Sequence, residues 1–281
     1  MGTRSIRSFP FAFVVAVAVA LPGCAAPETA AVPDAGSDQA AVANPPAPGF
    51  DVAGSDARAI ELADATMEAM GGRPAWDSVR YLSWNFFGVR YHVWDRHRGI
   101  DRVEWNDRDS GAAHVVIVDV ETGEGRAWID GVEVTDDDAR TALTTGAREA
   151  WINDAYWLVM PYKLKDSGVT LKYAGPGTLA DGRSAEVLEL TFEAVGVSPQ
   201  NKYRVYVADD TGLVEQWDFY ADRADAEPRF TTPWADWNPV GPIRLSGDRG
   251  QRKLNEIAVH EDLPAAVFED PAPTGLRAAA P

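Results

Sequence analysis

Residues 100–134 read IDRVEWNDRDSGAAHVVIVDVETGEGRAWIDGVEV, and this stretch decides the fold. Apolar side chains alternate with polar ones in short runs, the period typical of half-buried strands. Turn-forming residues separate the runs at 106–111 and 121–123, and Asp130-Gly131 is a strong signal for a two-residue hairpin. Connections this short join neighbouring antiparallel strands, so the stretch predicts a meander.

The chain before the meander predicts a helix and then a long strand. Apolar residues recur at helical spacing after Ser55 and Asp56, and Gly71-Gly72 supplies the stop. Period-two alternation then predicts a long strand from about Val79 to Trp94, with Gly88 as a bulge or a bend inside it.

The chain after the meander predicts a helical region and a second set of strands. Three consecutive aspartates at 136–138 favour a helix start, and the helical pattern runs to about Val159 with a break near Gly146. Strands are expected over 169–173, 185–192, 202–207, 213–220, 243–246 and 254–259. The whole predicts an α+β domain over residues 55–265: a large curved antiparallel sheet with helices covering its concave face.

The first residues have the pattern of a secretory signal. Arg4 and Arg7 precede an apolar run, and Leu21-Pro22-Gly23-Cys24 follows it, so we expect a signal peptide over residues 1–23. Residues 24–54 are rich in Ala, Pro, Gly and Asp, which predicts a flexible linker; a disordered tail is expected over 266–281.

Composition excludes several classes of protein. The chain has 43 Asp+Glu against 26 Lys+Arg, and a net charge of −17 would repel nucleic acid and anionic membrane surfaces. One cysteine forbids an internal disulfide and a cysteine-rich zinc site. No later stretch has the roughly 20 continuous apolar residues of a membrane span.

These features together resemble the LolA/LolB/LppX superfamily of bacterial envelope proteins. The ending at Cys24 resembles a lipobox, residues 203–220 resemble a hairpin of such proteins, and residues 151–164 (WINDAYWLVMPYKL) look like a signature of uncharacterised lipoproteins with this fold. The resemblance implies a half-barrel, acyl chains on Cys24 and a location in the cell envelope. Ala25 mildly favours the outer membrane, facing the periplasm. The implied function is non-covalent binding of a hydrophobic ligand: a lipid, an acyl chain or a lipoprotein.

Tryptophan, ten in number, is the most informative residue type for a binding site. Aromatic side chains on the strands and the mid-chain helix either line a cavity or fill a core, and the sequence leaves both open. The cavity candidates are Trp84, Phe86, Trp105, Trp128, Trp157, Met160, Trp217 and Phe219.

Two further tryptophans suggest a different function. Trp234 and Trp237 lie among prolines in an expected loop, where large aromatic side chains more often make contacts than fill a core. The alternative is therefore a carbohydrate- or protein-binding module without a lipid cavity.

Catalytic and metal-binding patterns are missing from the sequence. His92 and His97 flank Asp95, but their odd spacing places them on opposite faces of a strand, so we expect no metal site. No nucleophile, phosphate-loop or metalloprotease motif occurs, and we expect neither enzymatic activity nor a cofactor. Asn153-Asp154, inside the Trp-rich helix, either caps a restarted helix or places a polar group at a pocket mouth.

Overall fold

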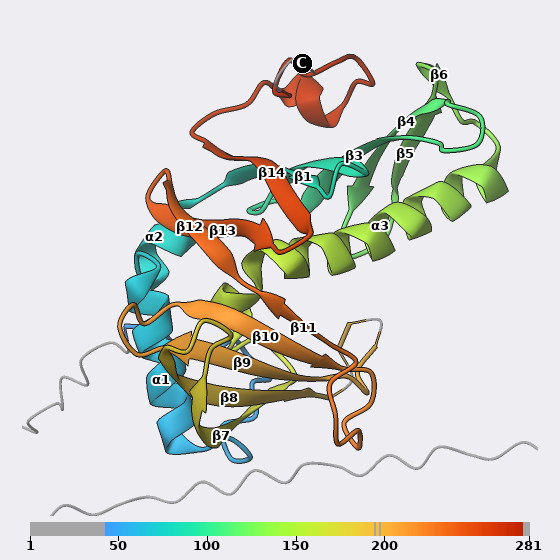
Figure 1. The fold of residues 1–281 in the computed structure, drawn as a ribbon. Helices are drawn as coiled ribbons and strands as arrows, with labels where there is room; N and C mark the ends of the chain where they lie inside the picture. The colour runs from blue at the N-terminus through green and yellow to red at the C-terminus, as the bar shows by residue number, and fades with distance from the viewer. Residues whose placement is uncertain (1–42, 194, 197, 278–281) are drawn as a thin grey trace, which may run out of the picture. The chain divides into compact units, whose positions relative to one another are not determined.

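The computed structural model describes residues 43–193, 195–196 and 198–277. The expected signal peptide, Cys24 and the greater part of the linker lie outside these residues, as does the end of the tail. Figure 1 shows two antiparallel sheets with one long helix, α3 (Asp137–Val159), beside them. The prediction of an α+β fold with a curved antiparallel sheet is confirmed, although the strands divide into two sheets instead of one.

The larger sheet has nine strands and combines the meander with the C-terminal part of the chain. Its order is β12 (Ala235–Val240), β13 (Ile243–Arg249), β14 (Arg252–His260), β1 (Tyr81–Phe86), β2 (Arg90–Asp95), β3 (Ile100–Asn106), β4 (Ala113–Asp119), β5 (Gly125–Ile129) and β6 (Val132–Glu133). The meander is confirmed from β2 to β6, because each of its strands pairs with the next.

The smaller sheet has five strands. Its order is β11 (Phe230–Pro233), β10 (Val214–Tyr220), β9 (Lys202–Ala208), β8 (Ser184–Phe192) and β7 (Val169–Thr178). Pro176 lies in β7, an edge strand of the sheet, which is the place in a sheet where proline is tolerated. The chain crosses from the smaller sheet to the larger between β11 and β12, at Trp234.

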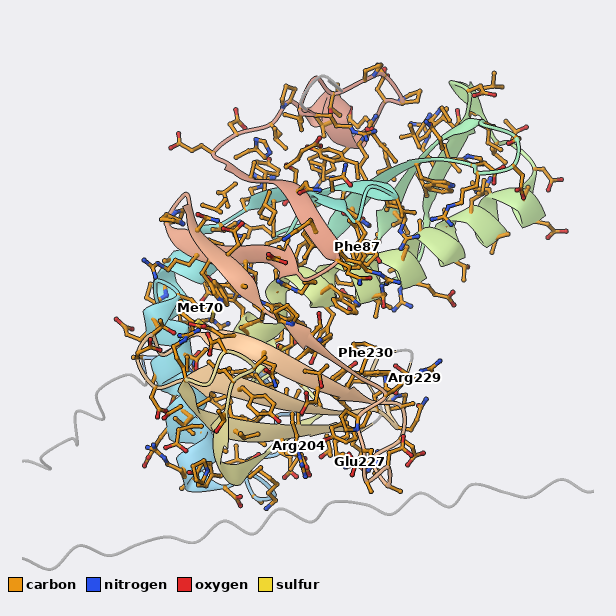
Figure 2. All side chains as sticks on the ribbon, in the orientation of Figure 1. Met70, Phe87, Arg204, Glu227, Arg229 and Phe230 are labelled. Atoms are coloured by element: carbon orange, nitrogen blue, oxygen red, sulfur yellow. The ribbon has the colours of Figure 1, made fainter. Side chains whose placement is uncertain are left out.

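The expectation of one long strand with a bulge or a bend at Gly88 is wrong. β1 and β2 form a hairpin, because Phe87 and Gly88 both have positive φ, 54° and 74°, and turn the chain back on itself. A positive φ at a phenylalanine is strained, and nothing local in the sequence signals it. Figure 2 labels Phe87 at this turn.

Helices pack against both sheets. α1 (Ala57–Ala69) packs on β7, and Gly71 ends its last turn at a point where a Cβ would lie 2.7 Å from the Pro242 carbonyl oxygen. α2 (Arg73–Ser78) follows it. α3 starts at Asp136, whose carboxylate accepts from the Ala139 N–H, and it is unbroken at Gly146, so the predicted break is wrong.

α3 separates into two halves by what it contacts. Leu143 and Ala147 pack on β3 to β5. Ala155, Leu158 and Val159 pack on the β1 and β13 side, and Tyr156 and Trp157 pack against the smaller sheet. η1 (Met160–Lys163) continues from its end.

Two segments expected to be unstructured belong to the folded body. Phe50 is buried against β7, and the Asp51 N–H donates to the Val169 carbonyl at 3.0 Å. The C-terminal chain, with η2 (Ala265–Phe268), covers the face of β1 and β2 opposite α3, where Val267 and Phe268 pack on Tyr81. The folded body therefore extends beyond residues 55–265 at both ends.

Candidate functional site

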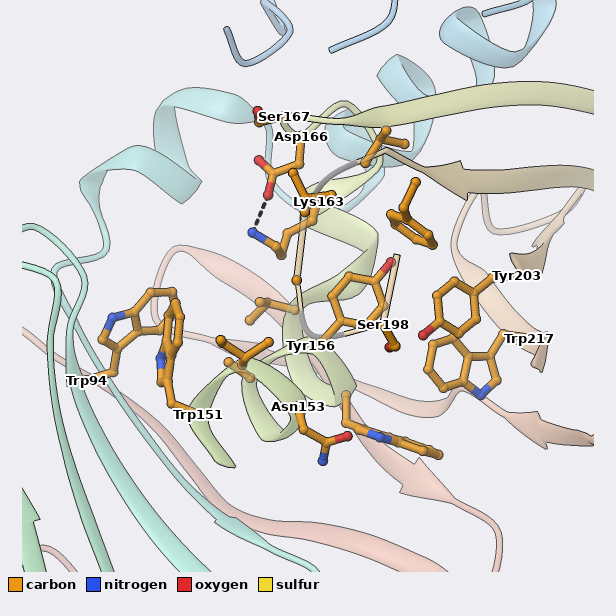
Figure 3. Close-up of a pocket in the computed structure, with 18 residues that line it drawn as sticks. Trp94, Trp151, Asn153, Tyr156, Lys163, Asp166, Ser167, Ser198, Tyr203 and Trp217 are labelled. Carbon is orange, nitrogen blue, oxygen red and sulfur yellow. Dashed lines mark ion pairs between the residues drawn. The ribbon is translucent and has the colours of Figure 1, made fainter. Parts of the chain in front are cut away.

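A cavity of about 350 Å³ lies beside the C-terminal half of α3, and Figure 3 shows the side chains that line it. Aromatic and aliphatic side chains from α3, β2 and the smaller sheet form most of its wall. The lining residues are Trp94, Trp151, Ile152, Asn153, Ala155, Tyr156, Trp157, Val159, Lys163, Asp166, Ser167, Val169, Phe192, Val195, Gly196, Ser198, Tyr203 and Trp217. A partly apolar recess of this size is at the lower end of the range of ligand pockets, about 300–1,000 Å³.

The aromatic wall consists of two groups of rings in contact. Tyr203 stacks on Trp217 with centroids 4.8 Å apart, and Trp217 meets Trp157 edge to face at 4.9 Å. Trp151 meets Trp94 edge to face at 5.2 Å on the other side. Rings held by their neighbours keep their orientation, so the wall is preorganised for an apolar occupant.

An ionic cluster holds α3 against β2 and β3 near the cavity. His92 Nδ1 lies 2.8 Å from Asp101 Oδ2, and His92 Nε2 lies 3.0 Å from Asp154 Oδ2. Arg90 donates to both oxygens of Asp154 at 2.6 and 2.9 Å, and Asn153 donates to Oδ1 at 2.8 Å. His92, Asp101 and Asp154 have no exposed surface.

The protonation of this cluster follows from its charges. Burial by itself would lower the pKa of His92, but the charge and hydrogen bonds of Asp101 and Asp154 outweigh it and raise the pKa to about 9. Burial also raises the pKa of Asp101, to about 6, against the charge of His92. Burial opposes the ionised form of Asp154 as well, but hydrogen bonds from His92 and Arg90 hold its pKa below the usual value. At pH 7 the cluster therefore holds two cations, Arg90 and His92, against two anions, Asp101 and Asp154. Pairing of this kind offsets much of the free energy that it costs to bury charged groups.

A buried arginine fixes the other side of α3. The guanidinium of Arg249 lies 3.5 Å from the ring centre of Trp234, and Nη2 donates to the Trp157 carbonyl at 2.8 Å. Burial lowers the pKa of Arg249 well below its usual value. Trp234 has no exposed surface, and Trp237 donates through Nε1 to the Val214 carbonyl at 2.8 Å.

Trp234 and Trp237 are therefore placed differently from the sequence-based expectation. They lie at the crossing between the two sheets, not in an exposed loop, and Trp234 offers no face to a sugar or a partner. Figure 2 shows Phe230 at the start of β11, and this ring, 37% exposed, is the more accessible aromatic side chain of that region.

Two of the eight predicted cavity residues line the cavity: Trp157 and Trp217. Trp84, Phe86 and Met160 are buried in the core, and Trp84 stacks on His92 at 4.5 Å. Trp105, Trp128 and Phe219 lie away from the cavity. The expectation that all eight residues line one cavity is therefore wrong. Trp128 is buried on the face of β5 opposite Ala127, Trp105 stacks on His114 at 4.8 Å, and Phe219 stacks on Phe230 at 4.9 Å.

Sequence reasoning missed Trp94, Trp151, Tyr156, Phe192 and Tyr203 as lining residues. A signal existed for the helical ones, because Trp151 and Tyr156 belong to the Trp-rich stretch that the sequence singled out. The residues Asn153 and Asp154 lie inside the unbroken helix α3 and therefore do not cap a second helix. Asn153 lines the cavity, and the Asp154 carboxylate contacts His92.

No three His, Cys, Asp or Glu side chains in residues 43–193, 195–196 and 198–277 form a cluster suited to a metal ion. Both ring nitrogens of His92 face carboxylates, and His97 is exposed with Nε2 3.0 Å from the Asp77 carbonyl.

Among the helices of the described chain, none combines the length and the apolar character needed to cross a membrane.

The chain matches no protein-family model and no curated protein significantly. Among solved structures it is similar to a DUF1329 family protein from Desulfovibrio piger: 13% identity, 75% of this chain and 96% of that chain covered, TM-score 0.41. It is also similar to an uncharacterized conserved protein from Thermus thermophilus, with 11% identity, coverage of 75% and 93%, and a TM-score of 0.25. The MucA/MucB complex of Pseudomonas aeruginosa matches with 15% identity, coverage of 78% and 61%, and a TM-score of 0.23.

Proposed function

We propose that this protein binds a hydrophobic ligand, such as a lipid or an acyl chain, non-covalently in the cavity beside α3. The observation that carries the proposal is the cavity itself: about 350 Å³, lined mainly by aromatic and aliphatic side chains that contact one another. Transfer of apolar surface from water to such a wall gains about 25 cal/mol per Å².

The arrangement of charge supports binding over catalysis. The buried histidine has both ring nitrogens committed to carboxylates and has no exposed surface, so it cannot take a proton from a ligand in the cavity. We therefore propose a binding protein without enzymatic activity.

The proposal extends to the location of the protein. Cys24, which lies outside the described residues, becomes acylated and anchors the chain in the bacterial envelope, with the binding domain in the periplasm and the outer membrane as the anchoring membrane. Several acyl chains give a stable anchor, whereas one chain binds only marginally.

Cys24→Ser should abolish incorporation of labelled fatty acid and move the protein from the membrane to the soluble fraction. Unchanged labelling of Cys24→Ser would contradict the anchor.

The binding function is tested by uptake of N-phenyl-1-naphthylamine, an uncharged apolar fluorophore. Ser198 lines the cavity, and Ser198→Trp should fill it and reduce uptake by tenfold or more. Ser184→Trp makes the same substitution at an exposed position of β8 outside the cavity and should leave uptake unchanged.

Two results would count against the proposal. The first is a folded wild-type protein that takes up no fluorophore. The second is equal uptake by wild type and Ser198→Trp, because uptake would then occur elsewhere.

A further inference from the structure

The wall of the cavity carries no uncompensated charge. Lys163 is the one cationic side chain among its described lining residues, and it forms an ion pair with Asp166 (Figure 3). Both side chains are more than a third exposed, so this pair lies at the rim. A charged ligand group inside the cavity would leave water without gaining an opposite charge, which is strongly unfavourable.

The wall does carry unused hydrogen-bond donors: besides the Tyr156 hydroxyl, the indole N–H groups of Trp94, Trp151 and Trp217 are buried without a partner among the described residues. The hydroxyl group of Tyr156 is buried and has no hydrogen-bond partner among the described residues. Its ring is held by Tyr203 at 5.7 Å and by Trp217 and Phe192, each at 6.3 Å. Burial and the neighbouring Tyr203 raise the pKa of Tyr156 well above its usual value, so the group remains an O–H donor.

A second hydroxyl lies in the same wall. Ser198 Oγ accepts from Asn201 Nδ2 at 2.7 Å, which occupies a lone pair and leaves its own hydrogen to donate. Figure 3 shows Ser198 between the rings of Tyr156 and Tyr203. The buried Tyr156 hydroxyl therefore calls for an acceptor from the ligand, since a buried donor without a partner costs free energy. The partly exposed Ser198 hydroxyl can donate to the ligand as well.

We propose that the ligand presents an uncharged hydrogen-bond acceptor, an ester or amide carbonyl, to the Tyr156 hydroxyl, with Ser198 as a second donor. This inference rests on the proposed binding function and specifies its ligand class. A carboxylate would accept the same hydrogen bond but bring an unpaired charge into the cavity. A quaternary ammonium would gain from the aromatic faces but has no acceptor for Tyr156.

The test compares three compounds with similar alkyl chains. Methyl decanoate, decanoate and decyltrimethylammonium each displace N-phenyl-1-naphthylamine from the full chain, purified and stripped of lipid. We expect methyl decanoate to bind more tightly than either ion, by about tenfold. Tyr156→Phe should weaken methyl decanoate about fivefold more than it weakens the fluorophore or decyltrimethylammonium, because only the ester uses the hydroxyl group.

Tyr91→Phe is the matched control. Tyr91 is also a buried tyrosine whose hydroxyl has no partner among the described residues, but it lies on the face of β2 that the C-terminal chain covers. Its loss should change none of the four affinities.

The outcomes separate the two proposals. If the fluorophore binds, three results overturn the inference and leave the binding function standing. They are equal affinities for the three compounds, tighter binding of either ion, and an ester affinity that Tyr156→Phe does not change. Failure of the fluorophore and of all three compounds to bind overturns both. Should Tyr156→Phe not fold, the ranking of the three compounds on the wild-type chain still decides.

Discussion

His92 Nε2 lies 3.0 Å from the Asp154 carboxylate and joins the middle of β2 to the second half of α3, 62 residues away along the chain. Asp154 precedes Tyr156 and Trp157 by two and three residues, so the contact fixes the part of the helix that presents these rings to the cavity. The ionic cluster thus positions the part of α3 that forms the aromatic wall of the cavity.

Removal of the histidine should destabilise the fold strongly. His92→Ala leaves Asp101 without its partner and Asp154 with only Arg90 and Asn153, inside an interior that water does not reach. Breaking a buried ion pair in this way costs about 3–5 kcal/mol. Urea unfolding measures the loss, and His97→Ala, the same change at an exposed histidine, should alter the free energy of unfolding little. Equal losses in the two variants would contradict the account of the cluster.

Stability should fall as the solution becomes alkaline. The pKa of His92 in the folded protein, about 9, is above the ordinary histidine value of 6.5, so its stabilising effect is complete below about pH 6.5 and is lost as the pH rises through 9. The loss is on the order of 3 kcal/mol. Urea unfolding at pH 6, 7, 8 and 9 should show the difference between wild type and His92→Gln shrinking over this range. A difference that is constant with pH would mean that His92 is uncharged at pH 7.

The C-terminal chain should detach when one arginine is removed. The guanidinium of Arg102 donates to the carbonyls of Val267, Asp270, Pro271 and Ala272 at 2.5 to 3.3 Å. Arg102→Ala should therefore increase hydrogen exchange at residues 265–272 at least tenfold and expose the apolar face beneath. Arg126→Ala removes one hydrogen bond, to the Glu269 carbonyl, and should have a much smaller effect. Unchanged exchange in Arg102→Ala would show that the apolar contacts of Val267 and Phe268 suffice.

Trp234 should prove to be a core residue. Trp234→Ala removes a ring with no exposed surface and takes away the partner of the Arg249 guanidinium, so it should cost about 3–5 kcal/mol. Trp105→Ala, at a half-buried ring stacked on His114, should cost clearly less. Binding of a glycan that Trp234→Ala abolished without loss of stability would contradict this and favour a carbohydrate-binding module.

Elements set by local signals could be predicted from the sequence. Asp130-Gly131 and the other turn residues fix the meander, and the Asp136 cap and Gly71-Gly72 fix helix ends, because each depends on a few neighbouring residues. The hairpin at Phe87-Gly88 was missed because a phenylalanine with positive φ is stabilised by its packing, here against Trp157 at 5.4 Å.

The cavity could be predicted only in part, because its lining depends on contacts between distant segments. Trp84 lies on the face of β1 that is turned toward α3, as the alternation of apolar residues predicts. Its ring stacks on His92, however, and does not line the cavity. Trp128 lies on the opposite face, since Ala127 is the residue turned toward α3. The pairing of His92 with Asp154 has no signature in sequence spacing at all. Trp234 was expected to be exposed because its prolines resemble a loop, whereas the chain there crosses between sheets.

Native mass spectrometry of the detergent-free protein tests the central claim most directly. Wild type, expressed in a bacterial host, should carry one lipid-sized ligand per chain, and Ser198→Trp should carry none while Ser184→Trp carries as much as wild type. Wild-type protein that is folded and empty, and that stays empty after incubation with methyl decanoate, would contradict the claim that this cavity is a binding site.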